Sequence, residues 1–360
     1  MPVIRLSVAA RSDVGRVRTS NEDSFTVADL DTGLRIEDES AMTEMDVRER
    51  GVLMVVSDGM GGHAAGEVAS ALVVDSLRDS LGESGNVESM ERLVEQAVQR
   101  ANADVFEAAR DKSKEGMGAT LTAVLVHKRE AYIAEVGDSR AYVLRQGRLR
   151  QMTKDQSFVQ VLLDSGAITS EQAKNFANKN WIVQAMGLEP NVHVSLGRLQ
   201  LRRGDRLLLC CDGLYNLVED KELSEILADD NLSVACNRMI DLANERGGSD
   251  NVTAIVAKVD GDGLPAADYD ESVTQTFEVL KEFKGLPLRD PSRDGDDDDE
   301  EDGEGLRAVA ALPSETPTVK PPPPSTRSEP ETPPERANIV AMAVVAVVLL
   351  AVVVGYWLTR

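Results

Sequence analysis

The segment Gly51–Gly62, GVLMVVSDGMGG, joins an apolar run to an abrupt polar end. The apolar run, Val52 to Val56, has the pattern of a strand that is buried on both faces. It ends at Ser57-Asp58-Gly59, so the carboxylate of Asp58 is expected where a rigid strand stops. The glycines that follow let the backbone approach whatever this carboxylate binds.

The same arrangement recurs at two later points of the chain. Leu207–Cys211 runs into Asp212-Gly213, and Ile133–Val136 runs into Gly137-Asp138. A single Asp-Gly after a strand is more often a turn than a ligand, so the argument rests on the recurrence. Acids at the ends of several apolar strands predict a cluster of oxygen ligands for hard divalent cations.

Composition limits the classes of function. The chain has 360 residues and a net charge of −23, which argues against nucleic acid as a partner because phosphate backbones require basic surfaces. Its three cysteines are too few for a disulfide framework and are expected to pack as small apolar residues in a reducing compartment. No signal peptide is recognisable at the first residues.

The segment Ile339–Leu358 is free of charge and long enough to cross a bilayer. Tyr356 and Trp357 lie near one end, where aromatic side chains favour the membrane interface. A buried core helix is the alternative, but the length and the absence of charge favour a transmembrane helix over 338–358. We therefore expect a single-pass protein of the cytoplasmic membrane, with the preceding residues in the cytoplasm.

Secondary-structure patterns predict an α+β catalytic domain over 1–260. Ala65–Leu81 and Ser89–Ala109 have the period of amphipathic helices, whereas most of the remaining segments are short apolar strands. Asp29–Arg50 is acidic and is expected to be a surface excursion. Strands and helices do not alternate, which indicates antiparallel sheets covered by helices.

Residues 261–337 are acidic and rich in proline, as is typical of a disordered, self-repelling linker. One part differs, because Val273, Phe277, Leu280 and Phe283 have helical spacing. The spacing predicts a short amphipathic helix over 271–284. A transient helix within the linker is an equally good interpretation.

The acids suggest a specific chemistry. Two adjacent divalent ions can hold a water, lower its pKa and orient a phosphoryl group for attack. Asp58 is the best candidate to bridge the ions, and Asp212 and Asp250 would complete the ring. Glu22 and Asp23 could act through water. Arg18 could bind phosphate, since a guanidinium group matches phosphate oxygens well.

Six motifs follow one another along the chain. They are Asp13-x-Gly15-x-x-Arg18-x-x-Asn21-Glu22-Asp23, Ser57-Asp58-Gly59-Met60-Gly61-Gly62-His63, Met117-Gly118-Ala119-Thr120, Val136-Gly137-Asp138-Ser139-Arg140, Leu209-Cys210-Cys211-Asp212-Gly213 and Gly248-Ser249-Asp250-Asn251-Val252. In this order they resemble the motifs of the metal-dependent serine/threonine protein phosphatases of type 2C, in their bacterial branch. The resemblance covers about residues 3–260.

This resemblance implies a central β-sandwich of two antiparallel sheets, flanked by helices on both sides. It implies two tightly bound Mn²⁺ or Mg²⁺ ions, a third and looser ion, and direct attack on phosphoserine or phosphothreonine by a water that bridges the two ions. Residues 155–187 correspond to the flap that gates substrate. The implied roles are metal ligation by Asp58, the Gly59 carbonyl, Asp212 and Asp250, water-mediated ligation by Glu22 and Asp23, the third ion at Asp138, and phosphate binding by Arg18.

One position departs from the eukaryotic pattern, since Met60 follows the Asp-Gly and the nearest histidine is His63. His63 could protonate the leaving group or cap the helix that follows.

The leading hypothesis is a membrane-tethered phosphatase, with a monomeric catalytic domain, that acts on phosphorylated proteins and opposes serine/threonine kinases. The alternatives are an adaptor that binds phosphoproteins without turnover and a related phosphatase of partner-switching pathways.

Overall fold

The computed structural model describes residues 3–36, 42–61, 64–83, 89–114, 116–174, 176 and 181–284, which belong to one compact unit, Met1–Gly285. The predicted transmembrane helix over 338–358 and the linker after residue 284 lie outside the described residues. Within the described ranges, no helix is long and apolar enough to cross a membrane.

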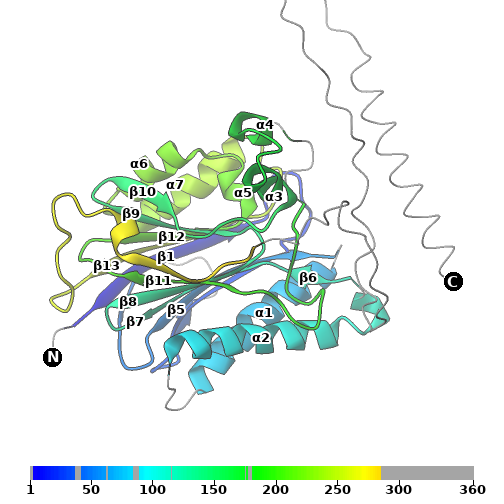
Figure 1. Cartoon of the computed structure of the whole chain (residues 1–360), viewed down its shortest axis with the longest axis horizontal. Helices are drawn as coiled ribbons and strands as arrows, with labels where there is room; N and C mark the ends of the chain where they lie inside the picture. The colour runs from blue at the N-terminus through cyan, green and yellow to red at the C-terminus, as the bar shows by residue number, and fades with distance from the viewer. Residues whose placement is uncertain are drawn as a thin grey trace, which may run out of the picture. The chain divides into compact units, whose positions relative to one another are not determined.

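Two antiparallel sheets form the centre of this unit (Figure 1). The first has six strands, in the order β10 (Arg148–Gln151), β9 (Arg140–Arg145), β12 (Arg206–Cys210), β13 (Val252–Asp260), β1 (Arg5–Asp13) and β4 (Thr43–Asp46). The second runs β14 (Phe277–Lys281), β11 (Ser195–Gln200), β8 (Glu130–Val136), β7 (Leu121–His127), β5 (Val52–Met60), β2 (Asp23–Asp29) and β3 (Arg35–Ile36), with β6 (Gly118–Ala119) paired to β5.

Helices cover the outer face of each sheet (Figure 1). The long helices α1 (Ala64–Glu83) and α2 (Met90–Ala108) pack on the second sheet, as their amphipathic period predicts. The helices α5 (Asp212–Tyr215), α6 (Asp220–Leu227) and α7 (Leu232–Glu245) cover the first sheet. Two short helices, α3 (Phe158–Asp164) and α4 (Ser170–Lys174), lie in the predicted flap. The layered α-β-β-α arrangement confirms the expected fold class.

Strand β5 shows why its sequence is apolar without interruption. Val52, Met54 and Val56 face the core between the two sheets, whereas Leu53 and Val55 face the core beneath α1 and α2. All five are inaccessible to solvent. Because both faces of the strand are covered, a polar side chain on either face would be buried. The prediction of a doubly buried strand is confirmed.

The helix predicted over 271–284 is wrong. Val273–Gln275 forms one 3-10 turn, and Phe277–Lys281 is the edge strand β14, antiparallel to β11. Phe277 packs against the core between the sheets, while Leu280 packs on the α1–α2 side. The open edge of β11 offers backbone partners that an isolated helix lacks, and tertiary pairing overrides the local spacing. The ordered domain therefore extends through residue 284, beyond the expected limit at 260.

The acidic excursion Asp29–Arg50 is also more structured than expected. It contains β3, which pairs with β2, and β4, which pairs with β1. The excursion therefore contributes an edge strand to each sheet. Residues 37–41, between these two strands, lie outside the described residues.

Candidate metal centre

Five carboxylates come together where the strands end at one end of the sandwich. Asp23 begins β2 and is paired directly with Asp58 of β5. Asp212 follows β12 as the first residue of α5, and Asp250 precedes β13, the neighbour of β12. Asp138 lies in the turn between β8 and β9. The structure thus brings together the three acids predicted at strand ends, Asp58, Asp138 and Asp212, with the further candidates Asp23 and Asp250.

The electrostatics of this cluster are unfavourable without counter-charges. Burial is the largest cause that raises the pKa of Asp58, and the charges of Asp23, Asp212, Asp138 and Asp250 raise it further. Burial also raises the pKa of Asp138 well above its usual value, and it raises that of Asp23 to about 7. Carboxylates that destabilise one another in a buried setting are stabilised by protons or by cations.

Asp23 has one oxygen satisfied and one free. Its Oδ2 accepts a hydrogen bond of 2.6 Å from the Thr253 hydroxyl. Its Oδ1 is buried and has no hydrogen-bond partner among the described residues. Buried oxygens usually find a partner, so this orphaned acceptor fits a water or cation at the cluster.

Glu22 is held by close contacts that only glycine permits. A Cβ added at Gly66 would lie 2.6 Å from Glu22 Oε2, and a Cβ added at Gly59 would lie 2.6 Å from the Glu22 carbonyl and 2.1 Å from that of Gly66. The Gly59 amide donates to the Glu22 carbonyl at 3.1 Å. The two glycines therefore let Glu22 lie against the end of β5 and the start of α1, beside Asp58.

Arg18 reaches the same cluster. Its Nη2 donates to Asp250 Oδ2 at 2.8 Å, and this bond raises the pKa of Arg18, with smaller contributions from the charges of Glu22 and Asp58. About half of the Arg18 side chain is exposed, at 51%. A partly exposed guanidinium group at the edge of a carboxylate cluster is suited to bind an anion that approaches from solvent.

Thr120 orders the end of β5, a role that the sequence interpretation missed. The amide of Asp58 donates to Thr120 Oγ1 at 2.9 Å, and the amide of Thr120 donates to the Asp58 carbonyl at 2.8 Å. The Thr120 hydroxyl also hydrogen-bonds Ser139 at 2.8 Å. Thr120 and Ser139 both lie within motifs quoted above, which is the signal that could have identified them.

Asn251 orders the backbone of the N-terminal motif, Asp13–Asp23, as Thr120 orders the end of β5. Its side-chain amide donates to the carbonyls of Val14 and Ser20, at 2.9 Å each, and its Oδ1 accepts from the Glu22 amide at 2.8 Å. These three bonds tie the loop that carries Arg18 to the turn that carries Asp250. These bonds need a side chain that both donates and accepts, which explains why an asparagine follows Asp250.

Asp138 lies beside an aromatic side chain, Tyr215, which itself packs against the cation Arg140. Tyr215 donates to its Oδ2 at 3.4 Å, and the Arg140 guanidinium lies 3.6 Å from the centre of the Tyr215 ring. Arg140 also makes two bonds to Asp155, at 2.8 and 2.6 Å. The residues next to Asp138 therefore contact the first residue of the predicted flap.

Gln156 fixes the base of the flap. Its side-chain Oε1 accepts from the backbone N–H of Gly137 at 2.9 Å, and its backbone N–H donates to the Gly137 carbonyl at 2.8 Å. Isolated pairing between Ser157 and Ile182 joins the two ends of the flap. The flap base is therefore rigidly bonded to the residue that precedes Asp138.

The residues present fit a centre of two divalent ions. Among the described residues, no group of three or more His, Cys, Asp or Glu side chains is already arranged to hold one ion. A two-ion centre requires fewer carboxylates for each ion, because one carboxylate can serve both ions and backbone carbonyls and water can supply further oxygens. His63, predicted as a general acid or a helix cap, lies outside the described residues, so neither role is tested.

Comparison with known proteins gives a consistent result. A family model described as protein phosphatase 2C matches residues 28–254. Serine/threonine protein phosphatase PstP of Mycobacterium tuberculosis is 39% identical over 272 residues, which are 75% of this chain and 47% of that protein. Serine/threonine phosphatase stp of Listeria monocytogenes is 36% identical over 255 residues, 69% of this chain and 94% of that protein. The chain thus spans less than half the length of PstP.

Solved structures show the same architecture. The M. tuberculosis phosphatase PstP/Ppp superposes with a TM-score of 0.61 at 38% identity, over 71% of this chain and 99% of that one. The catalytic domain of PstP in complex with two manganese ions has a TM-score of 0.59 at 38% identity, with the same coverage. Stp1 from Staphylococcus aureus has a TM-score of 0.62 at 32% identity, over 70% of this chain and 94% of that one.

Proposed function

Because the chain belongs to the protein phosphatase 2C family, we propose that it is a metal-dependent phosphatase that hydrolyses phosphoserine and phosphothreonine in proteins. One observation carries the proposal: Asp23, Asp58, Asp138, Asp212 and Asp250 converge at one end of the sandwich, with Arg18 at their edge.

The proposed ion ligands are Asp58, the Gly59 carbonyl, Asp212 and Asp250, with Glu22 and Asp23 acting through water. When bound, the two divalent ions supply Lewis acidity and lower the pKa of a water molecule between them. Either Mn²⁺ or Mg²⁺ suits carboxylate and carbonyl oxygens. A third, looser ion is proposed at Asp138, whose position is fixed by Tyr215 and by the Gly137–Gln156 bonds.

Arg18 binds the phosphate of the substrate in this proposal. Its guanidinium group now pairs with Asp250, an interaction that cations at the cluster would weaken by competing for the carboxylate. The group is then free to donate to two phosphate oxygens. The flap, over residues 155–187, borders Asp138 through Asp155 and Gln156 and would contribute to substrate access.

The proposal extends to location and partners. The charge-free segment Ile339–Leu358 supports a membrane anchor, since its length matches the hydrocarbon core of a bilayer. We infer a single-pass protein with its phosphatase domain in the cytoplasm, opposing serine/threonine kinases. We expect the full chain to remain with membranes after a carbonate wash and a chain ending at residue 337 to be released. Equal release of both chains would exclude the anchor.

Hydrolysis of p-nitrophenyl phosphate and of a phosphothreonine peptide by the full chain tests the activity. The comparison is wild type against Asp212→Asn, each with Mn²⁺ and with EDTA. The matched control is Asp241→Asn, which alters an exposed carboxylate on α7 that pairs with Arg11. Activity should require Mn²⁺, fall by at least about a hundredfold in Asp212→Asn and persist in Asp241→Asn. Bound Mn²⁺ without turnover would instead favour a binding protein.

A further inference from the structure

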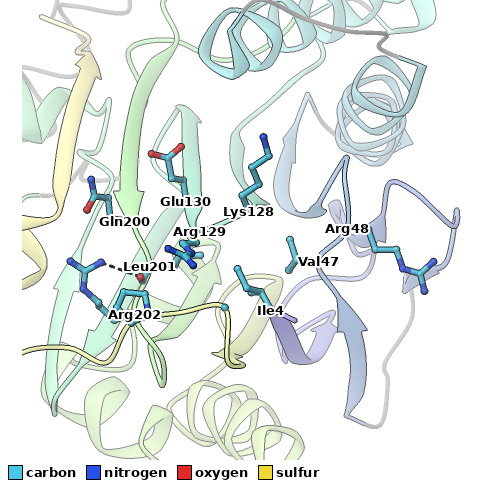
Figure 2. A pocket seen from close by; sticks show the side chains of 11 residues that line it. Ile4, Val47, Arg48, Lys128, Arg129, Glu130, Gln200, Leu201 and Arg202 are labelled. Carbon is cyan, nitrogen blue, oxygen red and sulfur yellow. Dashed lines mark hydrogen bonds between the residues drawn. The ribbon is translucent and has the colours of Figure 1, made fainter. Parts of the chain in front are cut away.

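Several cationic side chains gather at the end of the sandwich opposite the carboxylate cluster. A cavity of about 730 Å³ is lined there by Ile4, Val47, Arg48, Lys128, Arg129, Glu130, Gln200, Leu201, Arg202, Gly263 and Pro265 (Figure 2). Its residues come from the start of β1 and β8 and from the end of β4, β7 and β11. Strand β8 begins at Glu130, which lines the cavity, and ends at Val136, about 20 Å away at 3.3 Å for each strand residue, just before the turn that carries Asp138.

The cavity carries cations that the domain does not neutralise. Arg48, Lys128 and Arg129 are exposed, and none has an ion-pair partner among the residues that the structure describes. This is unusual in a chain with a net charge of −23, in which most other arginines of the domain bind a carboxylate. Positive charge is therefore concentrated at a cavity where no carboxylate of the described residues forms an ion pair with these three side chains.

The acidic and basic neighbours of these cations are already engaged. Arg202 makes two bonds of 2.7 Å to Glu271, and its Nη1 donates to the Leu201 carbonyl, the dashed line in Figure 2. Glu130, the only acid in the lining, accepts from the Tyr132 hydroxyl at 2.7 Å and lies 3.8 Å from Arg198. The Glu130 carboxylate thus contacts side chains of β8 and β11 and forms no ion pair with Arg48, Lys128 or Arg129.

The floor of the cavity is apolar. Ile4 and Leu201 are buried members of the core between the sheets, and Val47 packs against that core. In Figure 2, Ile4 and Val47 lie between Arg129 and Arg48, while Lys128 extends outward. An apolar floor with cations around it suits a ligand that has one apolar face and one anionic group. The volume lies within the range of small-molecule sites.

The surroundings favour a compact anion over an extended one. Gly263 and Pro265 belong to a loop that also carries the exposed acids Asp262, Asp268 and Asp270. A long polyanion or an anionic membrane would meet these acids, whereas a small ligand inside the cavity would avoid them and meet a single acid, Glu130, which is already engaged. We propose that this cavity, which we call the distal pocket, binds a small organic anion with a phosphate or carboxylate group, independently of the metal centre.

Calorimetric titration of the full chain tests the distal pocket. Phenylphosphonate, phthalate and a hexaglutamate peptide represent a compact phosphonate, a compact dicarboxylate and an extended polyanion. Each is titrated into wild type, Arg129→Gln, Arg129→Lys and Arg150→Gln, with Mn²⁺ and again with EDTA. Arg150 is the matched control, an exposed arginine of β10 without an ion-pair partner among the described residues.

We expect wild type and Arg150→Gln to bind at least one compact anion in EDTA, where the metal centre retains no cation. Arg129→Gln should weaken this binding at least tenfold, and Arg129→Lys should retain most of it. Turnover of p-nitrophenyl phosphate should be the same in wild type and Arg129→Gln. The proposal is overturned if no compact anion binds in EDTA, if Arg129→Gln binds as wild type does, or if hexaglutamate binds more tightly than both compact anions.

Discussion

Asp23 and Asp58 lie directly opposite each other on the adjacent antiparallel strands β2 and β5. Among the residues that the structure describes, neither forms an ion pair with a cationic side chain, and burial together with the charge of Asp23 raises the pKa of Asp58. Like charges opposite each other destabilise a sheet. The two carboxylates therefore repel each other in the folded chain. A cation bound between them would turn this repulsion into attraction.

The first prediction concerns pH and the metal-free protein. The pKa of Asp23 is raised from 3.8 to about 7, so the folded chain retains a proton that the unfolded chain has released. The free energy of unfolding should therefore fall as pH rises from about 4 to about 7. Asp23→Asn cannot ionise, so its Tm in EDTA should match wild type near pH 4 and exceed it by on the order of a few degrees at pH 8.

The control for this experiment is Asp241→Asn, whose carboxylate is exposed and paired with Arg11. Its Tm difference from wild type should not grow across the same pH range. A Tm difference for Asp23→Asn that stays constant from pH 4 to 8 would contradict the assignment of the raised pKa to this carboxylate.

The second prediction separates phosphate binding from metal binding at Arg18. Arg18→Ala should raise KM for a phosphothreonine peptide by about tenfold or more, equivalent to about 1.4 kcal/mol, because a charge-assisted contact to phosphate is lost. Arg18→Lys should restore part of the loss, since it keeps charge but not the two-pronged geometry.

Mn²⁺ affinity should not decrease in Arg18→Ala, because the variant frees Asp250 from its ion pair. The control is Arg246→Ala, which removes another exposed arginine bound to a carboxylate, Glu222. An unchanged KM in Arg18→Ala, or weaker Mn²⁺ binding, would show that Arg18 serves the carboxylates rather than the substrate.

A third prediction uses two glycines of the same helix. Gly66→Ala places a Cβ 2.6 Å from Glu22 Oε2, so the carboxylate must move and Mn²⁺ binding should weaken by about tenfold. Gly82→Ala meets no atom within 4 Å and should stabilise α1 by up to about 1 kcal/mol. Calorimetric Mn²⁺ titration and urea unfolding measure the two effects. Equal Mn²⁺ affinity in both variants would argue against a role for Glu22.

The fourth prediction concerns the extension after residue 260. Arg145 is buried, with two bonds to Asp205 and one of 2.6 Å to Thr276, and it lies 3.8 Å from Glu271. A chain ending at 260 removes Thr276 and Glu271 and exposes the edge of β11. Relative to a chain ending at 284, its free energy of unfolding should fall by about 2–4 kcal/mol.

Urea denaturation of the two chains measures this difference. Glu271→Gln in the longer chain serves as an intermediate variant, because it keeps β14 and removes one charge near Arg145 and Arg202. If the two chains unfold at the same urea concentration, the extension does not contribute to the domain and the contacts of Arg145 are not important for stability.

The local features of the centre follow from the amino-acid sequence. Unbroken apolar runs such as Val52–Val56 and Leu207–Cys211 indicated strands covered on both faces, and an acid at the end of each run indicated the site. The period of Ala65–Leu81 likewise indicated α1. These features depend on neighbours along the chain, so the pattern of residues reports them directly.

Which distant segments meet depends on tertiary pairing. Pairing of β2 with β5 places Asp23 opposite Asp58, and the packing of the N-terminal loop against the turn before β13 brings Arg18 to Asp250. The same kind of pairing turns Phe277–Lys281 into a strand despite its helical spacing, because the edge of β11 supplies backbone partners. Long-range pairing depends on the free energy of the whole fold, which no local pattern contains.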